Sequence, residues 1–490
     1  MSDMTFRKSP PLLGAMESVG SVCFPKSKVR SLLSPPHSPG ASRPTIPLQL
    51  LCGLLLLQLL VLLLVRKAPP CLPWLWNYQA APSLSQIERP LEICSGPRIF
   101  IYDLPPEFNV ELVGNCSTIN PWRSVCPALS NAGLGPRVDG VGLAASNSWY
   151  NTDQFTTEVI FHSRLRRHPC ITDDPELATA FYIPFYAGLD ICRYIFLPSS
   201  SAQQRDRLSK QLLDWLNGQY YWRRHGGWDH FLMIGRITWD FRRTREADWG
   251  SSFIYMPGMK NVTRLLIERN PWDEQEVAVP YPTSFHPTSD REVALWQDQV
   301  KKSKRSLLFS FAGAPRQAYP NDFRATLMDQ CLESGSCKSL NCSGKLCDTP
   351  QAVMELFLGS TFCLQPRGDS FTRKSTFDAL LAGCIPVFFW NQSAYWQYKW
   401  HLPAEEASYS VFIPKNAVRS GLKIKDVLMA IPEEQVKRMR GTIIRLIPNI
   451  VYAFSGNSFR KNKDAFDIAI DRVLRRVSIL KLNLRTPNLN

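Results

Sequence analysis

Residues 361–390 read TFCLQPRGDSFTRKSTFDALLAGCIPVFFW, and this stretch decides the fold. An apolar run rich in β-formers ends at Leu364, a turn containing Gly368 follows, and a helix is predicted to start at Thr372 as its N-cap. A second apolar run at 385–390 predicts another strand. Strand, turn, helix and strand form one βαβ unit, which is typical of a parallel α/β sheet.

The same turn offers groups that suit a nucleotide. A helix start presents backbone N–H groups and the positive end of the helix dipole to an anion. Arg367, Arg373 and Lys374 add positive charge there, and Asp378 lies about one and a half turns into the predicted helix, within reach of a ribose. A nucleoside diphosphate is therefore the expected ligand; the alternative is a packing turn with surface charges.

The alternation of strand and helix continues on both sides of this unit. Before it, strands are predicted at 98–103, 180–185 and 230–235, with helices at 153–167 and 203–217. After a proline-rich crossing at 279–287, a strand is predicted at 307–312, and helices at 322–331 and 351–358. Two βαβ domains with a ligand cleft between them follow from this pattern. An amphipathic helix at 464–480 is expected to pack back across both domains.

The segment 48–65 reads LQLLCGLLLLQLLVLLLV and contains no charge. Such a run predicts a transmembrane helix. It leads directly into Arg66 and Lys67 instead of a small-residue cleavage site, which disfavours a signal peptide. Six Lys or Arg precede the span against two acidic residues, which favours a cytosolic N-terminus and a lumenal body.

Cysteines and sequons agree with a lumenal body. Twelve of the 14 cysteines follow the span, an ordinary load where disulfides persist. Four N-glycosylation sequons begin at Asn115, Asn261, Asn341 and Asn391. Cys331, Cys337, Cys342 and Cys347 are spaced C-x5-C-x4-C-x4-C, which favours two disulfides over a zinc site because paired C-x2-C knuckles are missing.

The net charge of +15 is compatible with an anionic membrane, a phosphorylated ligand or a merely basic surface. The Lys and Arg residues are scattered and match no nucleic-acid-binding signature, so nucleic acid is disfavoured. The predicted organisation is a disordered tail (1–46), a transmembrane signal-anchor (47–65), a stem (66–96), an N-terminal acceptor-side domain (97–285), a C-terminal nucleotide-sugar domain (286–455), and a final helix with its tail (456–490).

The central stretch resembles the exostosin family of glycosyltransferases. The matching pieces are the P-R-G turn at 366–368, the D-A-L step at 378–380 and G-C-I-P-V at 383–387. Further pieces resemble the plant xyloglucan galactosyltransferase branch of that family: IYDLP at 101–105, YNTDQF at 150–155, FYIPFYAGLD at 181–190, GRITWDF at 235–241, VPYPTSFHP at 279–287 and FAGAPR at 311–316. The short anchor and the overall length look like the member that modifies the middle xylose of the repeat.

This resemblance implies an α/β fold of GT-B type, with two Rossmann-like domains facing a cleft. It also implies transfer of galactose from UDP-galactose to a xylosyl branch of xyloglucan, with inversion to a β-linkage and without a metal or other cofactor. The expected donor-site residues are Arg316, Arg367, Gly368, Ser370, Arg373, Lys374 and Asp378. Positive charge among them would stabilise the leaving UDP.

Inversion requires a base that accepts the proton of the acceptor hydroxyl. The candidates are Asp153, Glu158, His162 and Asp190, with Asp190 favoured; Asp153 is equally a candidate helix cap and His162 a candidate core histidine. Aromatic platforms are expected for the neutral glucan among Trp149, Tyr150, Trp239, Trp390, Trp396 and Trp400, although buried tryptophans usually belong to a core.

The anchor and the resemblance together imply a type II protein of the Golgi membrane, in possible complexes with other Golgi glycosyltransferases. Three rival hypotheses remain at this point. One is transfer of another sugar, such as galacturonic acid or arabinose, to a cell-wall polysaccharide. The second is a non-catalytic partner subunit, and the third is a glycan-binding module, for which the nucleotide-like turn would be superfluous.

Overall fold

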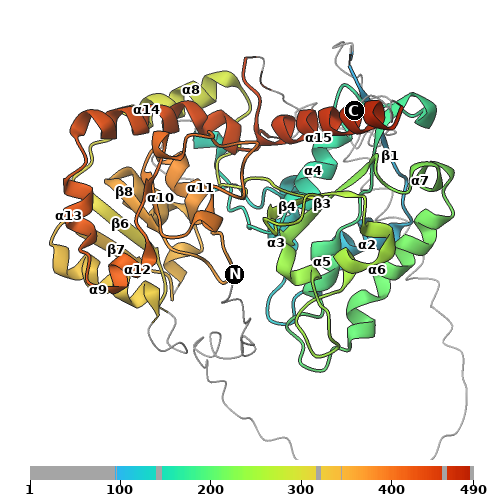
Figure 1. Cartoon of the computed structure of the whole chain (residues 1–490), viewed down its shortest axis with the longest axis horizontal. Coiled ribbons are helices and arrows are strands. Elements are labelled where there is room, and N and C mark those ends of the chain that lie inside the picture. Colours follow the sequence, from blue (N-terminus) through green and yellow to red (C-terminus); the bar gives the residue numbers. More distant parts are fainter. Residues whose placement is uncertain are drawn as a thin grey trace, which may run out of the picture. The chain divides into compact units, whose positions relative to one another are not determined.

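Within the described residues, ten strands form two five-stranded sheets, and every strand pairing is parallel (Figure 1). The first sheet has the order β1-β2-β3-β4-β5 and the second the order β10-β9-β8-β6-β7. The strands are β1 Arg98–Ile101, β2 Ala178–Tyr182, β3 His230–Ile237, β4 Thr263–Glu268, β5 Glu276–Ala278, β6 Leu307–Gly313, β7 Cys337–Asn341, β8 Ser360–Gln365, β9 Ile385–Phe388 and β10 Val411–Phe412. The α/β prediction is confirmed.

The computed structural model describes residues 94, 96–138, 146–315, 322–343, 345–454, 459 and 461–485. The predicted tail, the transmembrane span, nearly all of the stem and Arg316 lie outside these ranges. In the described ranges, every helix is too short or too polar to span a bilayer.

Helices connect the strands. They are α2 Val110–Gly114, α3 Cys126–Gly133, α4 Thr157–Leu165, α5 Ala187–Cys192, α6 Ala202–Asn217, α7 Tyr220–His225, α8 Asp290–Lys302, α9 Phe323–Ser334, α10 Pro350–Leu358, α11 Ser375–Leu381, α12 Lys415–Arg419, α13 Ile424–Met429, α14 Glu433–Ile450 and α15 Ala465–Arg485. Capping fixes several starts: at α6, Ser201 Oγ accepts from Gln204 N while Gln204 Oε1 accepts from Ser201 N. Central strands such as β4 and β9 are buried along their whole length, as expected where helices cover both sheet faces.

The order of strands differs between the sheets in one important way. In the first sheet every strand follows its neighbour in sequence, so the order never reverses. In the second sheet β6 lies between β7 and β8, and the chain builds outward from it in both directions. The loops that leave β6 and β8 therefore diverge, and such a switch point is where open α/β sheets bind ligands. The second sheet is the expected nucleotide side.

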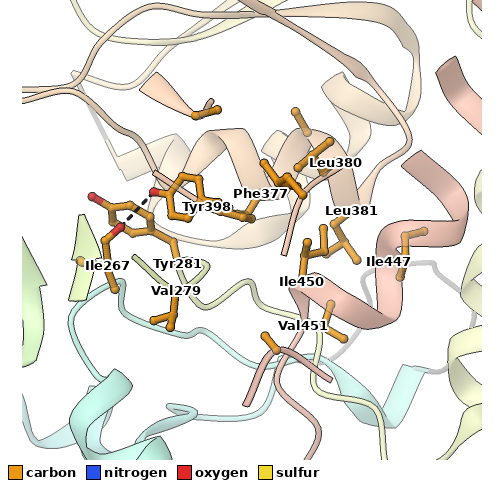
Figure 2. Packing of buried hydrophobic residues seen from close by; sticks show 14 of the residues in the cluster. Ile267, Val279, Tyr281, Phe377, Leu380, Leu381, Tyr398, Ile447, Ile450 and Val451 are labelled. Atoms are coloured by element: carbon orange, nitrogen blue, oxygen red, sulfur yellow. Dashed lines mark hydrogen bonds between the residues drawn. The ribbon is translucent and has the colours of Figure 1, made fainter. Parts of the chain in front are cut away.

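A single hydrophobic cluster contains residues from both sheets. Figure 2 shows part of it: Tyr281, which follows the first sheet, has its ring centre 6.3 Å from that of Phe377 of α11. Tyr398, which follows β9, donates from its hydroxyl to Ile267 O of β4 at 2.9 Å (Figure 2). Apolar packing and hydrogen bonds thus join the two sheets.

The last helix packs against β2 of the first sheet and against α14; the sequence predicted that it would pack across both domains. Arg164 of α4 is buried and donates to Asp464, just before α15, at 2.5 Å and to Asp467 at 3.2 Å. Its guanidinium also lies 4.6 Å from the centre of the Phe466 ring. In Figure 1 the red helix α15 runs beside α4, while α14 lies beside α11.

Among the residues that the structure describes, five disulfides form: Cys94–Cys170, Cys116–Cys126, Cys331–Cys337, Cys342–Cys347 and Cys363–Cys384. The cysteine cluster therefore forms two disulfides, and this prediction is confirmed. Cys192 is a buried thiol. In the described part of the chain, no three His, Cys, Asp or Glu side chains gather in a way that could hold a metal ion.

Candidate functional site

The loop at 366–374, which we call the donor loop, leaves β8 at the switch point and leads into α11. The sequence predicted that the helix starts at Thr372, and this was wrong: α11 begins at Ser375, and no side chain caps it. Thr372 does not cap α11 because its N–H and hydroxyl both donate to Glu268 of β4, at 2.8 and 2.5 Å.

Glu268 holds the donor loop from the other sheet. Its carboxylate is fully buried and also accepts from Ser370 Oγ at 2.7 Å, from Phe371 N at 3.2 Å and from Trp239 Nε1 at 2.8 Å. Buried polar groups need such partners, and a carboxylate bound by five donors is strongly fixed. Two N–H groups of the loop are therefore taken by Glu268 and are not offered to an anion as the sequence suggested. Sequence reasoning missed Glu268, since TRLLIE reads only as an apolar strand.

The conformation of the loop depends on Gly368. A Cβ built on this glycine would lie 2.3 Å from Thr372 O, far inside van der Waals contact. Any other residue would therefore push the backbone of the loop apart. The P-R-G signature thus has a steric reason in this structure.

Arg373 and Lys374, the last two residues of the donor loop, have different partners. Arg373 donates to Ala312 O at 2.8 Å and to Ser375 Oγ at 3.0 Å, which fixes its guanidinium beside the end of β6. Lys374 Nζ lies 2.8 and 3.0 Å from the two oxygens of Asp378, on the same helix face. Asp378 is thus placed one turn after Lys374, and the ribose role predicted for it stays a prediction.

Further cations gather at this edge of the second sheet. Lys415 of α12 has its Nζ 5.1 Å from the centre of the Trp390 ring. Burial lowers the pKa of Lys415, and the charges of Arg419 and Arg367 lower it further. A cation whose pKa is lowered by two neighbouring cations lies in a positive field, which attracts an anion. Lys415 and Arg419 were not predicted; no short motif marks them.

The candidate bases lie on the first sheet, around α4 and α5. Asp190 of α5 is nearly fully buried and pairs with Arg193; burial raises the pKa of Asp190, against the charge of Arg193. His162 Nδ1 is 2.8 Å from Tyr186 Oη, and burial lowers the pKa of His162 to about 4. Its imidazole is therefore neutral at pH 7.

Asp153 begins the turn before α4. Its Oδ1 accepts from Phe155 N at 2.9 Å and its Oδ2 pairs with Arg123 at 3.2 Å. The N-cap of α4 is Thr156, so the capping alternative for Asp153 is wrong. Asp174, by contrast, caps the short 3-10 helix Pro175–Leu177.

Glu158 is the most deeply buried of the candidates. It is fully buried and accepts from Gly188 N at 2.6 Å and Leu189 N at 3.2 Å. Burial raises the pKa of Glu158 to about 8, although these backbone donors and Arg236 act in the opposite direction. A Cβ on Gly188 would crowd this carboxylate, so the site is closely packed. Glu158 therefore supports the start of α5 and the position of Asp190.

Tyr281 connects the two groups of residues. It is buried, and its hydroxyl is 3.0 Å from Thr372 Oγ1 of the donor loop. Burial raises the pKa of Tyr281, and the charges of Glu268 and Asp240 add to this effect. Asp240 pairs with Arg236 at 2.5 Å, beside Glu158. Electrostatic interactions among these buried groups thus link Glu158 with the donor loop.

The predicted aromatic platforms divide into two groups. Trp149 and Tyr150 are core residues with 0% and 4% exposure, so they cannot receive a glycan. Trp239, Trp390, Trp396 and Trp400 are partly buried. Trp272, which was not predicted, is 55% exposed and contacts Phe371 of the donor loop. All four sequon asparagines are exposed, as glycosylation requires.

Comparisons of the sequence with known proteins identify one family. Residues 93–429 match the exostosin GT47 domain. Xyloglucan galactosyltransferase XLT2 of Arabidopsis thaliana is 54% identical over 392 residues, which cover 79% of this chain and 76% of that protein. Xyloglucan galactosyltransferase MUR3 of the same plant is 43% identical over 408 residues, covering 82% and 66%.

The Arabidopsis thaliana protein xyloglucan-specific galacturonosyltransferase 1 is 42% identical over 388 residues, covering 79% of this chain and 58% of that protein. Among solved structures, a GtfA/B complex aligns with a TM-score of 0.31 and 9% identity, covering 56% of this chain and 60% of that one. At this similarity the fold rests on the topology described above.

Proposed function

The chain belongs to the exostosin GT47 family, and we propose that it is a xyloglucan galactosyltransferase that transfers galactose from UDP-galactose to xylosyl branches. It is a glycosyltransferase. The observation that carries the proposal is the donor loop: a signature P-R-G turn at the switch point of a parallel sheet, surrounded by cations and fixed by a buried carboxylate.

The geometry favours a GT-B arrangement in which the second sheet binds the donor. Transfer releases UDP, whose diphosphate gains negative charge as the glycosidic bond breaks. Arg367, Lys415 and Arg419 supply positive charge at this edge and would stabilise that charge in the transition state. Lys374, directly before α11, pairs with Asp378 inside that helix, where the carboxylate would bind the ribose.

The first sheet would supply the base and bind the acceptor. Asp190 is the base that we propose, because a carboxylate held by Arg193 at the start of α5 has a fixed orientation. Removal of a positioned base lowers kcat by a factor of about 10² to 10⁴. Asp190→Asn should show such a loss with unchanged UDP affinity, whereas Asp153→Asn and His162→Gln should not.

We also propose that the apolar segment at 48–65 anchors the chain in the Golgi membrane, with the two sheets in the lumen. Five disulfides in the described part and four exposed sequons fit an oxidising, glycosylating compartment. The orientation is tested with an epitope tag fused to the C-terminus. In sealed vesicles the tag should be protected from protease, and detergent should abolish this protection.

The activity is tested with the detergent-solubilised full-length chain and a xylosylated glucan oligosaccharide. Turnover is expected with UDP-galactose and not with UDP-galacturonic acid. The opposite preference would support the alternative activity, which is named for a relative of 42% identity. Absence of turnover with every donor would contradict the proposal and favour a partner subunit.

A further inference from the structure

Four aromatic side chains meet where loops from the two sheets come together, and we call them the aromatic cluster. Trp239 follows β3, Trp272 lies on the loop that leaves β4, Phe371 belongs to the donor loop, and Trp396 follows β9. Ring centres are 5.6 Å apart for Trp239 and Phe371, 6.4 Å for Trp272 and Phe371, and 6.2 Å for Trp272 and Trp396. Each sheet thus contributes two members.

Hydrogen bonds hold the backbone on both sides of the aromatic cluster. Glu268 accepts from Trp239 Nε1 and Phe371 N, which fixes two of the four members. Gln397 Oε1 accepts from Arg269 N at 2.8 Å, and Gln397 Nε2 donates to Arg269 O at 3.2 Å. These bonds tie the loop of Trp272 to the segment of Trp396. The surface is therefore arranged before any ligand arrives, which lowers the entropy cost of binding.

Trp272 is the exposed member of the aromatic cluster, with 55% of its surface accessible to solvent. Its three neighbours in the cluster are partly buried and support it. A large indole left this exposed contributes little to the core and keeps an apolar face in water. Such a face beside a reaction site is suited to a ligand with an apolar face of its own.

We propose that Trp272 is a stacking platform for a sugar ring of the neutral glucan acceptor. The inference rests on the proposed function and assigns a subsite to it. The rings of a β-linked glucan expose apolar C–H faces, while their hydroxyl groups point outward at the edges. Such a face packs against an aromatic ring, and the indole N–H adds a polar contact.

The uracil of the donor is the other flat group that could stack there, and the charges argue against it. The diphosphate needs cations, and these lie toward the second sheet: Arg373 contacts Ala312 O, and Lys374 contacts Asp378. Trp272 lies on a loop of the first sheet and meets the donor loop at Phe371. A neutral acceptor needs no such charge.

The test compares the full-length wild type with Trp272→Ala, varying each substrate in turn. The acceptor is a xylosylated cello-oligosaccharide, and the donor is UDP-galactose. Loss of one aromatic stack should raise the acceptor KM by about three- to tenfold. The donor KM and the affinity for UDP should stay unchanged, and Trp272→Phe should recover most of the effect.

Tyr220→Ala is the matched control. Tyr220 is 61% exposed and lies on α7, which precedes the amino end of β3, away from the loops that leave the strands. This variant should leave both KM values unchanged. An unaltered acceptor KM in Trp272→Ala, or a raised donor KM, would contradict the proposal that Trp272 binds the acceptor.

Failure of the proposed function looks different, because the wild type itself would then show no turnover with this pair. In that case, the retention of wild type and of Trp272→Ala on a xyloglucan column tests the role of Trp272 independently of turnover. Weaker retention of Trp272→Ala than of wild type supports it, and equal retention overturns it.

Discussion

At the scale of single residues, the signature turn was predictable and its anchor was not. Gly368 could be recognised because a P-R-G turn before a helix is a local pattern. Glu268 could not, since its partners Ser370 and Thr372 are more than a hundred positions away and nothing local marks the pairing. The predicted start of the helix was wrong for the same reason: Thr372 donates to a carboxylate that is distant in sequence, and it does not cap the helix.

Glu268→Gln should loosen the donor loop. The carboxylate accepts five hydrogen bonds, and an amide would turn its NH2 group toward some of those donors in either orientation. The donor KM should rise about tenfold, as expected for loss of roughly 1.4 kcal/mol of binding, with a smaller change in the acceptor KM. Steady-state kinetics and UDP titration measure this.

Glu292→Gln provides the control, because Glu292 also accepts from the N–H and hydroxyl of one threonine, Thr288, but lies on α8. Glu292→Gln should lower the free energy of unfolding without changing the donor KM. Equal donor KM values in wild type and Glu268→Gln would show that Glu268 is purely structural.

His401 should make the fold sensitive to acid. It is fully buried, and burial lowers its pKa to about 4 from an unfolded value near 6.5. The unfolded chain therefore binds a proton between pH 6.5 and 4 that the folded chain does not, so this contribution to stability is present above pH 6.5 and is lost as pH falls. The cost is about 1.4 kcal/mol per pH unit.

His401→Gln keeps a donor for Ala465 O, which the His401 ring contacts at 3.0 Å, and removes the titration. Urea midpoints measured from pH 7 to 4 should fall less steeply in the variant than in wild type. Parallel curves would mean that His401 is already protonated in the folded state.

At the scale of elements, strongly patterned segments were predicted and weakly patterned ones were missed. β3, β6, β8 and β9 are apolar runs bounded by turn signals, and the sequence located each to within a few residues. β7 reads CKSLN and is an edge strand with mostly exposed side chains, so it carries no hydrophobic signal. β5 has three residues, too few for a pattern, and it forms a strand because it pairs with β4.

The disulfide Cys363–Cys384 joins β8 to the segment before β9 and encloses the donor loop with α11. Its sequence separation is 21, against 5 for Cys342–Cys347. Because the entropy of loop closure grows with loop length, losing the longer link should cost about 3 kcal/mol and losing the shorter one about 2 kcal/mol. Urea denaturation of the two double Cys→Ala variants measures the difference.

The donor loop adds a second readout to this comparison. UDP affinity should fall only when Cys363–Cys384 is removed, since Cys342–Cys347 lies after the edge strand β7. Equal UDP affinity in both variants would show that packing alone orders the loop.

At the scale of the whole molecule, the sequence predicted two parallel α/β halves and a returning helix. The strand order β10-β9-β8-β6-β7 could not be predicted, because order depends on which buried faces pair across the sheet. Contacts across the two sheets, such as Tyr398 with Ile267, are equally invisible to local patterns. The family motifs nevertheless lie at the switch point that the topology creates, which is where open α/β sheets bind ligands.

Arg164 links α15 to the first sheet, so the stability of the fold should depend on this side chain. It bonds Asp464 and Asp467 and also donates to Ala453 O at 3.1 Å, all within a buried site. Arg164→Ala would leave Asp464 buried and without its cation, at a cost of about 3 to 5 kcal/mol. The thermal midpoint should fall sharply, and protease should release α15 first.

Two further variants separate charge from general packing. Asp464→Asn placed on Arg164→Ala should recover part of the loss, because it removes the uncompensated buried charge. Lys437→Ala breaks an exposed pair with Glu433 and should change stability little. If Arg164→Ala proved as mild as Lys437→Ala, apolar packing of Phe466 and its neighbours would be what holds α15, and the ion pair would only set its register.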